Sequence, residues 1–176
     1  MNEPKELNCG FIIIAPDNNP KLVEITASSI RNKYSKSPFI CIVTSEISPE
    51  DAREISQMCP TYQAQNSYSS LINEGIKNSP SDWNLVVISG TSIRSRFFRK
   101  YSCFIKSEKD ILFPVVDRKW NFVDATVNGI FMHKNVHGEV GDIPQLNTIQ
   151  ECKAVWAVDA LNKGYKFKAV VGSGLI

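Results

Sequence analysis

The stretch Gly10–Ala15, GFIIIA, decides the fold class of this chain. It is a short, continuous apolar run rich in isoleucine, and such runs are typical of strands that are buried on both faces of a parallel sheet. A loop, PDNNP, follows it, in which Asn19 is a good N-cap and Pro20 fits the first position of a helix. We expect that helix to extend to about Tyr34, so the chain opens with a buried strand followed by a helix.

The alternation of strand and helix continues along the chain. Apolar runs predict further strands at Phe39–Thr44 and Trp83–Ser89, and we expect a short strand near Thr61–Gln65. A helix capped by Ser48 and a helical stripe over Tyr68–Ile76 lie between them. This succession is typical of βαβ units, whose right-handed crossovers place helices on a mostly parallel sheet. We therefore predict a single α/β domain with a mostly parallel mixed sheet flanked by helices.

The second half of the chain has a different pattern. We expect a helix at Ile93–Tyr101, with Thr91 or Ser92 as its cap, and then strands at Ile111–Val116 and Thr126–His133. A loop at Asn135–Asn147 follows. The chain then forms a helix at Thr148–Lys163, which stops at Gly164, and a last strand at Tyr165–Val171.

Composition narrows the class of protein. There are 20 Lys and Arg residues against 18 Asp and Glu residues, and the net charge of +2 argues against binding nucleic acid by charge alone. No apolar run is long enough to cross a membrane, and the opening residues MNEPKELN lack the pattern of a secretory signal peptide. The five cysteines are scattered singly, so we expect buried thiols in a reduced, cytoplasmic protein rather than a disulfide framework or a zinc site.

Four segments carry a resemblance to a known family. They are GFIIIAPDNN from Gly10, LINEGI from Leu71, DWNLVVISGTSI from Asp82 and QECKAVWAVDALNKGYKF from Gln150. Their order and spacing resemble the glycosyltransferase A fold, particularly inverting family 2-like enzymes. The resemblance implies a nucleotide-binding βαβ half at residues 9–101 and a shortened acceptor-side half at 102–176. It also implies transfer of a sugar from a nucleotide-diphosphate donor to a saccharide or protein acceptor.

The positions that match the family's D-x-D metal motif are Ser89-Gly90-Thr91. Mg²⁺ and Mn²⁺ prefer carboxylate oxygens, which this stretch lacks, so we predict no metal ligands and no metal cofactor. Ser89 and Thr91 are candidates for hydrogen bonds to a phosphate; the alternative is a simple turn between strand and helix. Arg94 and Arg96 follow, and they are either a clamp on the diphosphate or part of a solvated basic face.

The resemblance also assigns a general base. Glu151 matches the acid of the family's E-D pair, while Cys152 replaces its partner. The alternative is structural, because Thr148 and Glu151 form a T-x-x-E pattern in which the glutamate caps its own helix.

The remaining candidates lie in loops. Asp17 and Glu46 follow the first two strands and are candidates for binding the nucleotide, with turn chemistry as the alternative for Asp17. Asp117, Trp120 and Asp124 are candidates for binding the acceptor, because rings stack on sugars while acids accept bonds from hydroxyls; a buried aromatic anchor is the alternative for Trp120. Two hypotheses follow: a metal-independent glycosyltransferase, or a catalytically inactive binding or structural module.

Overall fold

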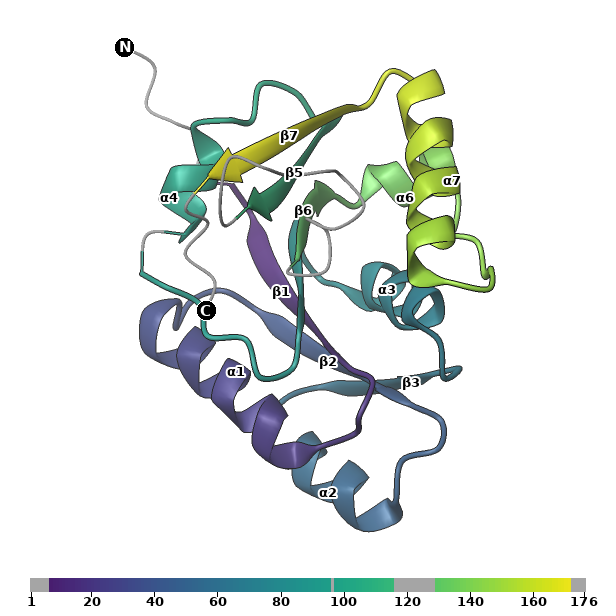
Figure 1. Cartoon of the computed structure of the whole chain (residues 1–176). Coiled ribbons are helices and arrows are strands. Elements are labelled where there is room, and N and C mark those ends of the chain that lie inside the picture. The colour runs from purple at the N-terminus through teal and green to yellow at the C-terminus, as the bar shows by residue number, and fades with distance from the viewer. Residues whose placement is uncertain (1–6, 96, 116–128, 172–176) are drawn as a thin grey trace.

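The computed structural model describes residues 7–95, 97–115 and 129–171, and they form one seven-stranded sheet with helices on both faces (Figure 1). The strands are β1 (Cys9–Ala15), β2 (Phe39–Thr44), β3 (Thr61–Ala64), β4 (Trp83–Ile88), β5 (Asp110–Val115), β6 (Ile130–His133) and β7 (Lys166–Val171). The helices are α1 (Pro20–Lys33), α2 (Pro49–Met58), α3 (Tyr68–Asn78), α4 (Phe97–Ser102), α6 (Asn135–Val140) and α7 (Ile149–Asn162).

The strand order is β3-β2-β1-β4-β6-β5-β7. All neighbouring pairs are parallel except those of β6, which is antiparallel to both β4 and β5. The predicted α/β fold with a mostly parallel mixed sheet is therefore confirmed. The chain moves outward from β1 to β3, and α3 then returns it to β4 on the other side of β1. The switch point of the sheet thus lies between β1 and β4, where open α/β sheets bind ligands beyond the carboxyl ends of their strands.

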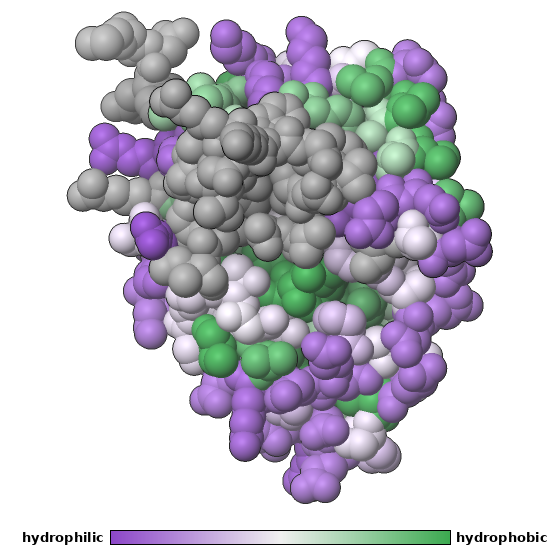
Figure 2. Space-filling view, in the orientation of Figure 1, coloured by the Kyte–Doolittle hydropathy of each residue, from purple (hydrophilic) through white to green (hydrophobic). Residues whose placement is uncertain are grey.

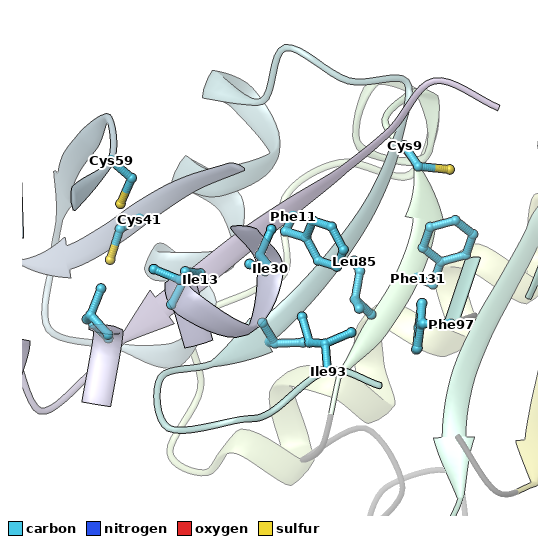
Figure 3. Packing of buried hydrophobic residues seen from close by; sticks show 14 of the residues in the cluster. Cys9, Phe11, Ile13, Ile30, Cys41, Cys59, Leu85, Ile93, Phe97 and Phe131 are labelled. Carbon is cyan, nitrogen blue, oxygen red and sulfur yellow. The ribbon is translucent and has the colours of Figure 1, made fainter. Parts of the chain in front are cut away.

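Alternate residues of β1 enter two separate cores, which explains its continuous apolar run. Phe11 and Ile13 pack in a cluster with residues of α1, α2 and α4 (Figure 3). Ile12 and Ile14 pack on the opposite face with residues of α3, α6 and α7. Because side chains of a strand alternate between faces, only a run that is apolar at every position can serve both cores.

Local signals at the helix ends are confirmed. Asn19 accepts a hydrogen bond from the Lys21 amide, and Ser48 caps α2 in the same way. Gly164, at φ +83°, follows α7 in the left-handed region that favours glycine. The five cysteines are free of disulfide bonds in the structure; Cys103 is exposed and the other four are buried. No helix of the described residues is long and apolar enough to span a membrane.

The helix predicted at Ile93–Tyr101 is wrong at its start, since α4 begins only at Phe97. The backbone of Ile93 is bound to α1 instead: its amide donates to the Ser29 hydroxyl at 2.8 Å, and its carbonyl accepts from Lys33 Nζ at 2.6 Å. These bonds hold Ile93 outside a helix, so the prediction that Thr91 or Ser92 caps this helix is wrong as well.

Two further predictions need correction. The loop expected at Asn135–Asn147 contains α6, whose Val136 packs in the second core. No side chain caps the start of α6, which explains why no sequence signal marked it. The strand expected at Thr126–His133 begins at Ile130 among the described residues, and 126–128 lie outside them.

Candidate functional site

One side chain joins the loop after β1 to the end of β2. The Thr44 amide donates to Asn18 Oδ1 at 2.8 Å, and Asn18 Nδ2 donates to Thr44 Oγ1 at 2.6 Å. Asn18 lies in the left-handed region at φ 51°, which asparagine tolerates better than most residues. These bonds fix the carboxyl edge of the sheet beside β1. Asn18 was not predicted as a site residue, since its sequence context indicates only a turn.

Asp17 is exposed at this edge, next to Asn18. A cavity of about 420 Å³ opens here between the start of α1 and α2, and its lining residues are Asp17, Asn18, Asn19, Pro20, Lys21, Asp51 and Glu54. Three of these side chains are carboxylates and one is a lysine. The cavity is therefore suited to hydroxyl and amine donors rather than to phosphate groups.

Glu46 lies at the next strand end along the edge. It is exposed, and its Oε2 accepts a hydrogen bond from Asn66 Nδ2 at 2.8 Å. The neighbouring Ser45 amide donates to the Ala64 carbonyl at 2.8 Å. Glu46 thus lies beside the carboxyl end of β3, on the far side of β2 from Asp17.

The end of β4 completes the edge. The Ser89 amide donates to the Ile14 carbonyl at 2.9 Å, and the Gly90 amide donates to the Leu22 carbonyl at 2.8 Å. Gly90 has φ +91°, and an added Cβ there would contact Leu22. The Ser89 hydroxyl is buried and has no hydrogen-bond partner within the part of the chain that the structure describes. Buried polar atoms are usually paired, so this hydroxyl keeps a hydrogen-bonding capacity that no described residue uses.

The chain then leaves the edge and runs along α1 (Figure 1). The Arg94 carbonyl accepts from the Tyr34 hydroxyl at 2.8 Å, and Tyr34 is the C-cap of α1. Since α1 has 14 residues, its two ends are about 21 Å apart. The structure therefore does not bring Arg94 together with Asp17 and Ser89, which lie near the start of α1. Arg96 lies outside the described residues.

Glu151 lies at the start of α7 in a complete capping box. The Glu151 amide donates to Thr148 Oγ1 at 3.1 Å, and the Thr148 amide donates to Glu151 Oε2 at 3.2 Å. The side chain is exposed. The structural alternative for Glu151 is thus present in full, with its carboxylate turned onto the backbone of its own helix.

A buried lysine follows Glu151 that sequence reasoning missed. Lys153 is 2% exposed, and its Nζ lies 4.5 Å from the centre of the Tyr68 ring at the start of α3. Burial lowers the pKa of Lys153 to about 8, because it disfavours the charged amine. Neighbouring Cys152 is buried and accepts a hydrogen bond from the Leu146 amide at 3.2 Å. The only sequence signal for Lys153 was its place in the segment from Gln150, one of the four that carry the family resemblance.

The middle of this face is apolar. Figure 2 shows apolar side chains gathered between α1 and α3, with more hydrophilic side chains below and to the right of them. Small-molecule sites are mostly apolar with a few placed polar groups, and the edge just described supplies such groups.

Known structures share this fold. No family model and no curated protein matches the chain. The mannosyltransferase PcManGT from Pyrobaculum calidifontis, in complex with GDP-Man and Mn²⁺, matches with a TM-score of 0.71 at 9% identity, over 97% of this chain and 57% of that one. S. aureus TarS 1–349 matches at 0.67 and 11% identity, over 92% of this chain and 58% of that one. Its complex with UDP-GlcNAc matches at 0.67 and 10% identity, over 92% and 56%.

The fold is glycosyltransferase A-like. This chain spans a little over half the length of these structures, and identities near a tenth establish the fold alone. The resemblance that the sequence predicted is confirmed at that level.

Within this glycosyltransferase A-like sheet, the end of β4 does not fit a divalent cation. Ser89, Gly90 and Thr91 offer no carboxylate. Among residues 7–95, 97–115 and 129–171, no three His, Cys, Asp or Glu side chains come together in a way that holds a metal. The predicted acceptor-binding residues Asp117, Trp120 and Asp124 lie outside these described ranges.

Proposed function

We propose that this domain binds a nucleoside-diphosphate sugar and transfers its glycosyl group to a saccharide or protein acceptor, without a cation at the D-x-D position. The observation that carries the proposal is the edge beyond β1, β2 and β4. There the Asn18–Thr44 bonds tie the loop after β1 to the end of β2, and the Ser89 hydroxyl at the end of β4 has no partner among the described residues, in a glycosyltransferase A-like sheet. The complexes of PcManGT with GDP-Man and of TarS with UDP-GlcNAc support this class of ligand.

The proposed binding roles follow the order of the strands. Asp17 and Glu46 bind the nucleoside, since the acidic cavity beside Asp17 accepts hydroxyl and amine donors. Ser89 and Thr91 donate to the phosphates. Arg94 and Arg96 remain proposed partners of the diphosphate, although the backbone of Arg94 lies at the far end of α1. Asp117, Trp120 and Asp124 remain the proposed acceptor residues.

Transfer requires a base. The acceptor hydroxyl attacks the anomeric carbon, the bond from that carbon to the diphosphate oxygen breaks, and the electron pair leaves with the diphosphate. The hydroxyl proton passes to a general base. Glu151 stays the predicted base, and to act it must exchange its bond to the Thr148 amide for one to the acceptor.

A second candidate function is a catalytically inactive binding module. Two observations favour it: the Glu151 carboxylate is engaged in the capping box, and Cys152 occupies the other acidic position of the resembling pair. Such a module binds the donor without turning it over.

Calorimetric titration with a panel of nucleotide sugars, with and without Mn²⁺, tests the proposal. We expect binding that Mn²⁺ does not change. Absence of binding at millimolar donor would overturn both functions, and binding only with Mn²⁺ would overturn metal independence. Release of free nucleoside diphosphate in the presence of saccharide acceptors then separates the enzyme from the inactive module.

A further inference from the structure

Lys153 is a buried cation without an anion. Its side chain is 2% exposed, and no oxygen within the described residues accepts a hydrogen bond from its Nζ. No carboxylate pairs with it there either. Burying an unpaired ammonium costs free energy, and the Tyr68 ring at 4.5 Å offsets only part of that cost. An amine in this state gains from any anion that reaches it.

The position of Lys153 relates it to the candidate site. The start of α7, which carries Lys153, and the start of α3, which carries Tyr68, both pack over the second core. Ile88, the residue before Ser89, packs against the same core. Lys153 therefore lies on the α3 and α7 side of the sheet, beside the start of α3, which follows the carboxyl end of β3.

We propose that the Lys153 ammonium binds a phosphate oxygen of the donor, where it supplies the positive charge that the carboxylate-free end of β4 cannot hold as a metal ion. This inference rests on the proposed function. Lysine binds phosphate as a compact point charge. Arg94 is less suited, because its backbone is bound to Tyr34 at the far end of α1.

The amine carries the necessary charge at neutral pH. A pKa of about 8 leaves most Lys153 side chains protonated at pH 7. A phosphate beside the ammonium favours its charged form and raises that pKa again. A purely structural lysine would show no such response to the ligand.

The experiment uses the protein labelled with ¹³C at the lysine ε carbons, with the Lys153 signal assigned from Lys153→Met. We expect pyrophosphate and nucleoside diphosphates to shift this signal and raise its titration midpoint, and the unphosphorylated nucleosides to leave both unchanged. In calorimetry, Lys153→Met weakens nucleoside-diphosphate binding at least tenfold. Lys77→Met on neighbouring α3, whose lysine is exposed and paired with Asp142, changes binding less than twofold.

The outcomes separate this inference from the proposed function. If the donor binds while the Lys153 ¹³C signal stays unchanged, the inference is overturned and the proposed function still stands. A pyrophosphate response without binding of any nucleotide sugar supports the anion site and overturns the function. If the Lys153 signal does not respond to pyrophosphate and no nucleotide sugar binds, both the inference and the proposed function are overturned. Because the wild-type titration is decisive by itself, the test holds even if Lys153→Met folds poorly, and Lys153→Gln then replaces it for the assignment.

Discussion

Asn18 and Thr44 exchange two hydrogen bonds, at 2.6 and 2.8 Å, across the ends of two neighbouring strands. One asparagine side chain thereby replaces the backbone bonds that β1 and β2 can no longer make beyond their ends. Asn18 makes these bonds from the left-handed region, at φ 51°.

Asn18→Ala tests this pair. We expect the free energy of unfolding to fall by about 1–3 kcal/mol, because two hydrogen bonds are lost and alanine is strained at positive φ. Chemical denaturation gives the measurement. Asn66→Ala, which removes one exposed bond to Glu46, is the matched control and changes stability by less than about 0.5 kcal/mol. Equal effects of the two variants would contradict the role of Asn18.

Substitutions of Glu151 distinguish its cap from its predicted role as base. Glu151→Gln keeps a side chain that completes a capping box, so we expect near-wild-type stability. We expect Glu151→Ala to lower the free energy of unfolding by about 0.3–1.5 kcal/mol, measured by chemical denaturation. A glycosyl-transfer assay then tests the role of Glu151 as the base. Loss of turnover in the stable Glu151→Gln variant identifies Glu151 as the base, whereas retained turnover means that Glu151 only caps its helix.

Gly75 of α3 tests how closely that helix packs on the sheet. A Cβ at this position would collide with the Ile12 side chain of β1, which is fully buried. We expect Gly75→Ala to lower the free energy of unfolding by about 1–3 kcal/mol, through overpacking of the second core.

Gly138 in α6 is the control, because nothing lies within 4 Å of its added Cβ. There Gly138→Ala is neutral or stabilising by up to about 1 kcal/mol, since alanine favours a helix. Loss of stability in Gly138→Ala equal to that in Gly75→Ala would show that the close contact with Ile12 is not the cause.

The buried Lys153 predicts a dependence of stability on pH. Its pKa is lowered from 10.5 to about 8 in the folded protein, so between these values the unfolded chain binds more protons. The free energy of unfolding therefore rises as the pH rises from about 8 to 10.5. Below pH 8 the folded protein bears the full free-energy cost of burying the charged amine. We expect Lys153→Met to be more stable than the wild type at pH 7, by about 1–3 kcal/mol, with the gap closing towards pH 10.

Denaturation of both proteins across this range measures the gap. Lys77→Met, which removes an exposed lysine, should show no comparable change with pH. A gap between wild type and Lys153→Met that stays constant would mean that the amine keeps an ordinary pKa.

Much of the fold was predictable because its signals are local. The apolar run at Gly10–Ala15, the caps Asn19 and Ser48, and the stop at Gly164 each depend on residues close in sequence. The start of α4 was not predictable, since bonds from Ser29 and Lys33 of α1 hold Ile93 outside the helix.

The sequence by itself determined the alternation of strands and helices, the resemblance to the glycosyltransferase A fold and the absence of carboxylates at Ser89–Thr91. Only the tertiary structure decided which polar groups meet. It placed Arg94 beside Tyr34, bound Asn18 to Thr44 and buried Lys153 against Tyr68. The physical reason is that periodicity and capping act within a turn or a strand, whereas burial and charge pairing depend on contacts between segments that are far apart in the sequence.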